Sequence, residues 1–124
     1  MDIQSTSYTP KVYFDSDKSI LEISGRSFPE NAKDFYVPII DELPTIIDAS
    51  KTEVIFRINL EYFNTSSSKF LLQMLQWFEQ FSKNNQSTVT VEWWYVEDDE
   101  DMKEAGEEYE QIVDLPFSFI EEKE

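Results

Sequence analysis

Asn64-Thr65-Ser66-Ser67-Ser68-Lys69 joins the two clearest patterns in the sequence. Before this stretch, residues 53–63 alternate between apolar and polar side chains, which is typical of a β-strand. After it, apolar residues recur at helical spacing from Phe70 to Phe81, and we expect a helix from near Ser66 to Lys83. Four hydroxyl side chains therefore lie at a strand-to-helix junction, where small polar side chains accept from the free N–H groups of the first helical turn.

The same junction suits a phosphate group. The free N–H groups and the helix dipole both favour negative charge at a helix N-terminus. Capping needs only one or two of the four hydroxyls from Thr65 to Ser68, and a cation, Lys69, follows them directly. The residues leave two interpretations open here: a polar helix cap, or a regulatory phosphorylation site shaped by Asn64, Ser66, Ser67, Ser68 and Lys69.

The first half of the chain predicts a hairpin and a helix. We expect residues 1–8 to be flexible and strands at 11–15 and 19–25 to pair through a turn, with Gly25 in a backbone geometry that other residues resist. The helix that follows begins at Ser27 or Asn31 and reaches about residue 49. Its two prolines, at 38 and 44, favour one bent helix, with two short helices as the alternative.

The second half continues the alternation of strands and helices. The pattern predicts a strand at 87–96, a helix over 97–110 that ends by residue 113, and a short edge strand at 117–120. The order β-β-α-β-α-β-α-β predicts one α/β domain with a mixed β-sheet, an opening β-hairpin and layered α-helices. Alternation along 53–63 places the following residues on the core face: Val54, Phe56, Ile58, Leu60 and Tyr62.

Composition narrows the function. The net charge of −16 disfavours binding to nucleic acid or to anionic lipid, and no apolar run is long enough to span a bilayer. The chain has no cysteine and no histidine, which removes thiolate chemistry, the commonest general base and the commonest metal ligand. The first six residues lack the features of a secretory signal peptide, so we expect a cytoplasmic protein. We also expect no cofactor.

Two further features suggest other classes of function. The acidic run at 97–101 suggests a cation-binding or hydrolytic domain, although the calcium-loop spacing is absent because Gly106 falls too late. The apolar stripe of the second helix is wider than one sheet contact needs, so an exposed member such as Phe70 or Trp77 is a candidate partner-binding residue. Alternatively, self-association into a structural homo-oligomer would bury the same excess of apolar side chains on this helix. Trp93 and Trp94 are adjacent on a strand and must face opposite sides, so we expect one of them to lie on an outer surface, where it could anchor a partner.

Four segments together resemble the SiaC-type regulatory phosphoproteins of bacteria. They are Thr9-Pro10-Lys11-Val12-Tyr13-Phe14-Asp15, Ile23-Ser24-Gly25-Arg26-Ser27-Phe28-Pro29-Glu30-Asn31, Tyr62-Phe63-Asn64-Thr65-Ser66-Ser67-Ser68-Lys69, and Asp98-Asp99-Glu100-Asp101-Met102 with Gly106-Glu107. The resemblance covers nearly the whole chain, and its most specific parts are Ser-Phe-Pro-Glu-Asn and Asn-Thr-Ser-Ser. The one departure at these parts is Phe28, where the family often has tyrosine.

The resemblance implies a fold similar to the STAS-domain anti-sigma factor antagonists and a non-enzymatic switch. It implies phosphorylation of the threonine of Asn-Thr-Ser-Ser, which here is Thr65, by an anti-sigma-factor-type protein kinase, and removal of the phosphate by a PP2C-type phosphatase. It also implies that the unphosphorylated form binds and activates an output protein, a diguanylate cyclase, in cyclic-di-GMP signalling and biofilm formation.

Overall fold

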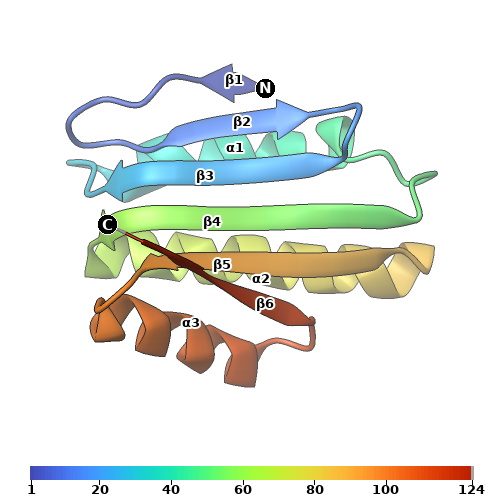
Figure 1. Cartoon of the computed structure of the whole chain (residues 1–124). Helices are drawn as coiled ribbons and strands as arrows, with labels where there is room; N and C mark the ends of the chain where they lie inside the picture. The colour runs from blue at the N-terminus through green and yellow to red at the C-terminus, as the bar shows by residue number, and fades with distance from the viewer. Residues whose placement is uncertain (124) are drawn as a thin grey trace.

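The computed structural model describes residues 1–123 and consists of one mixed sheet with helices packed on one of its faces (Figure 1). The strands are β1 (Asp2–Ile3), β2 (Lys11–Asp15), β3 (Ile20–Ser27), β4 (Glu53–Phe63), β5 (Thr88–Val96) and β6 (Phe117–Glu122). The helices are α1 (Ala32–Ile46), α2 (Thr65–Asn85) and α3 (Glu100–Ile112). The predicted α/β order is confirmed, and β1 is an additional short strand within the N-terminal segment.

The strands follow one another across the sheet in chain order, from β1 to β6. The first three pair antiparallel, and β3 to β6 pair parallel. Each parallel pair needs a helical crossover, and successive right-handed crossovers in one direction place their helices on the same face. In Figure 1, α1 and α2 lie behind the sheet, and no helix lies in front of β2, β3 or β4. The sheet therefore has one covered face and one open face.

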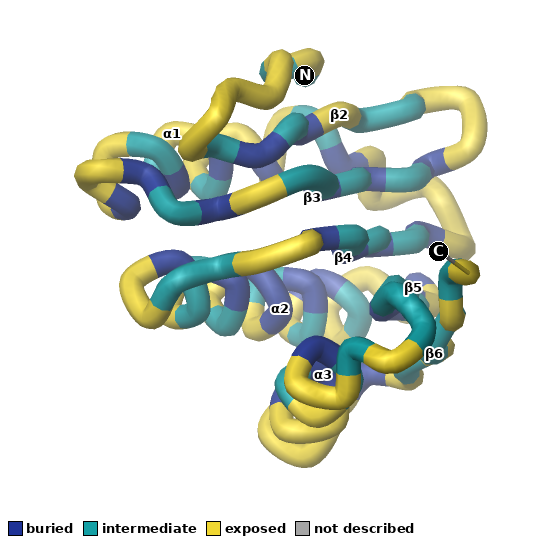
Figure 2. Tube along the Cα trace, turned by 60° about the vertical axis from the view of Figure 1, so that its left-hand side comes forward, coloured by how far each residue is buried: buried dark blue, intermediate teal, exposed yellow. Residues whose placement is uncertain are grey.

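The core lies between the covered face and the helices. From α1 and α2 it receives fully or almost fully buried side chains that include Tyr36, Leu43, Leu71, Met74 and Phe78. The strands supply Val54, Phe56, Ile58 and Leu60 from β4, as the alternation predicts, with matching residues from β3 and β5. Each buried side chain of this size contributes about 1.5–3 kcal/mol of hydrophobic stabilisation. In Figure 2, buried positions recur along the strands and along α2, whereas α3 projects with much of its surface exposed.

The first helix is continuous through both prolines. Asn31 caps it, because its side-chain oxygen accepts from the backbone N–H of Asp34 at 3.2 Å. Pro38 and Pro44 lie inside the helix on its exposed side, where solvent can bond the carbonyl groups that lose their helical partner. The structure therefore selects Asn31 over Ser27 as the cap and one helix over two. The helix ends at Ile46, earlier than predicted.

Tyr62 was placed wrongly by the alternation. The β3–β4 register shifts between Gly25 and Arg26, which pair with Leu60 and Tyr62, so Glu61 is an extra residue in β4. Such a bulge reverses the facing of the residues after it. Tyr62 is consequently 48% exposed. Gly25 has a φ of +103°, which confirms that this position needs a backbone geometry other residues resist.

Trp93 and Trp94 face opposite sides of the sheet, as predicted. Trp94 lies on the open face with the Arg57 guanidinium 5.5 Å from its ring centre, and Arg57 is paired with Glu22 and Glu92 from the two neighbouring strands. The Trp94 ring therefore already packs against a side chain of this protein. Across residues 1–123, no helix is both long and apolar enough to cross a membrane.

Trp93 positions α3 on the covered face. Its indole is fully buried, and its Nε1–H donates to the Met102 carbonyl at 2.9 Å. Gly106, one helical turn later, lies directly against the ring: a Cβ atom there would be 2.5 Å from Cδ1 and 2.6 Å from Nε1 of Trp93. The glycine therefore allows the helix backbone to approach the indole closely. The helix begins at Glu100 behind an Asp99 cap, later than the predicted start at residue 97.

We expect Gly106→Ala to lower stability, although alanine is intrinsically the better helix former by about 1 kcal/mol. Forcing a methyl group into the indole costs about 1–3 kcal/mol, which outweighs that gain. Urea unfolding of the variant measures the difference. Glu107→Ala, at the exposed neighbouring position, is the control and should stay within about 0.5 kcal/mol of wild type. A higher unfolding midpoint for Gly106→Ala would contradict the close approach.

Candidate functional site

The junction between β4 and α2 is held to the end of β3. Asn64 is the N-cap of α2, and its side-chain oxygen accepts from the Ser67 N–H at 2.9 Å. The Asn64 backbone N–H donates to the Ser27 carbonyl at 3.0 Å, and the Asn64 carbonyl accepts from the Ser68 N–H at 3.0 Å. The predicted strand-to-helix junction is confirmed, and its cap is Asn64.

Ser67 is a structural hydroxyl. It is fully buried, its Oγ donates to the Ser27 carbonyl at 3.1 Å, and it accepts from the Ser27 hydroxyl at 2.8 Å. Because the Ser27 proton is used there, the Tyr36 hydroxyl must donate to Ser27 in the remaining bond of this group. Burial raises the pKa of Tyr36, which keeps that proton in place. The three hydroxyls tie β3, α1 and α2 together.

The other three hydroxyls of the stretch are less buried than that of Ser67. Ser68 is half-buried and its Oγ donates to the Thr65 carbonyl at 2.7 Å, a common local bond in the first helical turn. Thr65 and Ser66 are exposed, and among residues 1–123 neither side-chain hydroxyl makes a hydrogen bond. The structure therefore divides the four hydroxyls into two that make hydrogen bonds and two that are exposed and make none within residues 1–123.

A groove runs beside Thr65, between the beginning of α2 and α3. Its volume is about 420 Å³, and Thr65, Ser68 and Lys69 line it from α2 while Ser66 does not. Opposite them, α3 contributes Glu108 and Tyr109. Thr65 and Lys69 are four residues apart, so they are neighbours on one face of the helix. A negative group on Thr65 would thus lie near one cation and opposite one carboxylate.

Tyr109 connects α3 to this site. Its hydroxyl donates to the Ser68 carbonyl at 2.8 Å, and burial raises the pKa of the phenol well above its ordinary value. The group therefore remains a neutral donor throughout the physiological range. Its ring lies 5.6 Å from that of Trp93, centre to centre, so the contact that positions α3 also positions the groove. Nothing in the sequence indicated that Tyr109 bonds the Ser68 carbonyl, which lies forty-one residues earlier in the chain.

Phe70 and Trp77 lie in the seam between α1 and α2, and both are half-buried. Phe70 stacks on Tyr36 with ring centres 5.7 Å apart, and Trp77 stacks on Phe81 at 5.3 Å. Trp77 also lines a second groove of about 280 Å³ that α1 closes with Pro44. The structure does not bring these two residues to the Thr65 groove, and their role as partner-binding residues stays a prediction.

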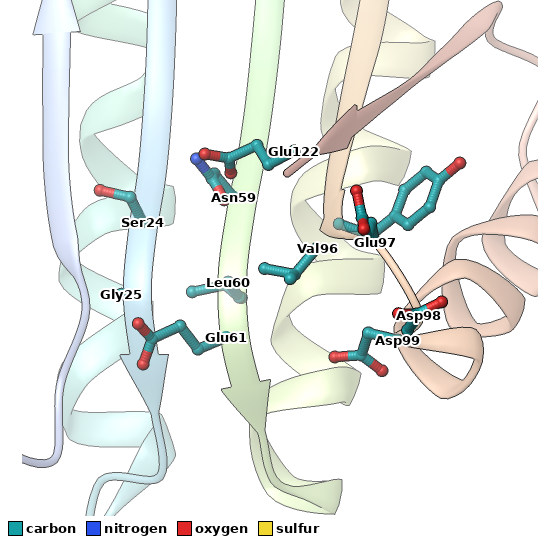
Figure 3. Close-up of a pocket in the computed structure, with 11 residues that line it drawn as sticks. Ser24, Gly25, Asn59, Leu60, Glu61, Val96, Glu97, Asp98, Asp99 and Glu122 are labelled. Atoms are coloured by element: carbon teal, nitrogen blue, oxygen red, sulfur yellow. The ribbon is translucent and has the colours of Figure 1, made fainter. Parts of the chain in front are cut away.

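A wider cleft lies at the C-terminal ends of β3, β4 and β5, the same end of the sheet as the Thr65 junction, and is rich in carboxylates (Figure 3). Its volume is about 650 Å³, and it is lined by Glu61 from β4, by Glu122 from β6, and by Asp98 and Asp99 from the connection between β5 and α3. In Figure 3 the Glu61 carboxylate points towards β3, whereas Asp98 and Asp99 lie at the beginning of α3. Within residues 1–123, no three such side chains are grouped in a way that would hold a metal ion.

Comparison with known proteins identifies the family of the chain and agrees with its fold. A sequence model described as the SiaC family of regulatory phosphoproteins matches residues 3–122. The chain belongs to the SiaC family. A relative in Pseudomonas aeruginosa (strain UCBPP-PA14), described as uncharacterised, is 27% identical over 116 residues, which cover 94% of this chain and 91% of the relative. The family predicted from the four segments is thereby confirmed.

Solved structures of SiaC from Pseudomonas aeruginosa have the same fold. SiaC, described as the activator of the diguanylate cyclase SiaD and crystallised in complex with it, is 25% identical, with a TM-score of 0.88 over 98% of this chain and 99% of that one. Apo-SiaC is 26% identical, with a TM-score of 0.84 over 97% of each chain. The predicted α/β fold class is confirmed, and the protein is a member of a family of regulatory phosphoproteins.

We expect Ser67→Ala and Ser66→Ala to separate the structural hydroxyls from the free ones. Ser67→Ala leaves the buried Ser27 hydroxyl without its acceptor, which should cost about 1–3 kcal/mol of stability. Ser66→Ala removes an exposed hydroxyl and should change stability by no more than about 0.5 kcal/mol. Thermal unfolding monitored by circular dichroism makes the comparison. Equal stability of the two variants would contradict the three-hydroxyl network.

Proposed function

We propose that this protein is a non-enzymatic, phosphorylation-switched signalling protein in the cytoplasm. An anti-sigma-factor-type kinase transfers a phosphoryl group to the Thr65 hydroxyl, and a PP2C-type phosphatase removes it. The unphosphorylated form binds and activates a diguanylate cyclase. Membership of a family of regulatory phosphoproteins supports this proposal, together with the SiaC–SiaD complex of Pseudomonas aeruginosa.

One observation carries the choice of Thr65. It is the exposed hydroxyl that both lacks a hydrogen bond within residues 1–123 and lines the groove beside Lys69. Ser66 is also exposed but does not line that groove, and Ser67 is buried. A phosphate on Thr65 would therefore change a concave surface between two helices, where a partner protein would be sensitive to it.

The physics of a helix N-terminus favours a switch that does not unfold the protein. A phosphate at the first position of α2 adds a charge of about −1.5 to −2 beside free N–H groups. The helix dipole stabilises such a charge by about 0.3–1 kcal/mol, and Lys69 is within one turn. The modified protein should keep its fold, so the partner must read the phosphate on the surface.

We expect Thr65→Ala to fold as wild type and to take up no phosphate. The substitution removes an exposed group, so stability should change by no more than about 0.5 kcal/mol. The assay incubates the protein with ATP and the kinase from the same organism and locates the phosphate by mass spectrometry. Ser66→Ala is the matched control and should be phosphorylated normally. Undiminished phosphate on Thr65→Ala would refute the assignment.

We also expect phosphorylation to abolish activation of the cyclase. Cyclic-di-GMP formation from GTP is measured with the purified cyclase of the same organism alone, with the unphosphorylated protein, and with the phosphorylated protein. The unphosphorylated protein and Thr65→Ala should both raise the rate, because neither carries the added charge in the groove. The proposal fails if the phosphorylated form activates as well as the unphosphorylated form does.

A further inference from the structure

A patch of aromatic rings lies beside the Thr65 junction. Tyr8 and Tyr62 are 61% and 48% exposed, which makes them two of the few large hydrophobic side chains on the described surface. Both meet Phe28 edge-on, with ring centres 5.4 Å and 5.9 Å away. We call Tyr8, Phe28 and Tyr62 the aromatic patch. It joins the N-terminal segment, the end of β3 and the end of β4.

The patch is held in place by hydrogen bonds. The Thr6 hydroxyl accepts from the backbone N–H groups of Tyr8 and Thr9, at 3.1 Å and 2.9 Å, and the Phe28 N–H donates to the Tyr8 carbonyl at 2.8 Å. The bulge at Glu61 turns Tyr62 outwards. Rigid, exposed aromatic side chains lose little conformational entropy on binding and are common anchors of protein interfaces.

The folded state of the phosphorylation site explains why such an anchor is needed. A kinase that reads an extended peptide would need the residues on both sides of Thr65. Ser67 is buried, and Asn64 is bonded through its side chain, its N–H and its carbonyl. The residues next to Thr65 are therefore not accessible as an extended peptide, so an enzyme acting on this helix start must bind the folded surface around it.

We propose that the aromatic patch is the docking site for the kinase that phosphorylates Thr65; this inference rests on the proposed function. The patch is continuous with the junction, because Tyr62 precedes the Asn64 cap by two residues and the Asn64 N–H bonds the Ser27 carbonyl next to Phe28. Because this protein has a net charge of −16, electrostatic complementarity favours a basic docking surface on the kinase.

The chemistry of the rings fits such a surface. Lysine and arginine side chains bind favourably over aromatic faces. The chain's own Arg26 occupies a face of Phe28, 5.3 Å from its ring centre, so the exposed rings of Tyr8 and Tyr62 are the ones that a kinase side chain would contact. The Glu61 carboxylate lies at the edge of the patch, 4.0 Å from the Arg26 side chain. This carboxylate offers a second contact for a basic side chain of the kinase. The kinase side of the interface is therefore expected to present arginine or lysine together with apolar groups.

Steady-state phosphorylation of variants tests the docking site. The substitutions are Tyr8→Ser, Tyr62→Ser and the double change, with Tyr13→Ser, an exposed tyrosine on the open face, as the matched control. The probe is the kinase used for the Thr65 assay. The double variant should raise KM by about ten-fold or more while kcat stays within about two-fold, because docking and not phosphoryl transfer is lost. Tyr13→Ser should leave both constants unchanged.

The outcomes are distinguishable. If the wild-type protein takes up no phosphate at Thr65, the proposed function fails and this inference fails with it. If the wild type is phosphorylated and the double variant, shown to be folded by circular dichroism, has an unchanged KM, only the inference is overturned. An unchanged KM with loss of cyclase activation would overturn it too and would assign the patch to the output protein.

Discussion

Ser27 determines where α2 begins, and the rest of the candidate site depends on that position. Its carbonyl accepts from the Asn64 N–H and from the Ser67 hydroxyl, and its own hydroxyl donates to Ser67. A buried polar group that loses its partner costs more than a hydrogen bond contributes, so this arrangement resists any shift of the helix start. The Tyr36 hydroxyl, which bonds the Ser27 hydroxyl, connects this hydrogen-bond network to α1. The exposed Thr65 is thus held at a fixed place on a rigid surface.

A second contact sets the other wall of the site. The close approach of Gly106 to Trp93 brings α3 against the sheet, and Tyr109 then reaches the Ser68 carbonyl. The groove beside Thr65 therefore has one wall fixed through β3 and another fixed through β5. Because both walls are packed into the same core, a partner that binds there meets a preformed surface and need not order it on binding.

The sequence could predict the elements and the junction but not the contacts between distant residues. Alternation and helical spacing depend on neighbours along the chain, so β4 and α2 were found nearly to their ends. Tyr62 was misplaced because a bulge depends on the pairing of β4 with β3, which no local pattern reveals. The burial of Ser67 was missed for the same reason, since its partner is Ser27, forty residues earlier in the chain. Capping accounted for only one or two of the four hydroxyls, and the tertiary bond to Ser27 is what identifies Ser67 as structural.

The charge of the protein limits how a phosphate can act. Adding about −2 to a chain that already carries −16 changes the long-range field only modestly. At physiological ionic strength, exposed charges are screened beyond about 8 Å. A partner that distinguishes the two forms must therefore contact the immediate surroundings of Thr65, where Lys69, Glu108 and the end of β4 lie. The switch is accordingly a local event, and the surfaces on either side of Thr65, the groove and the aromatic patch, are the ones on which a partner can sense it.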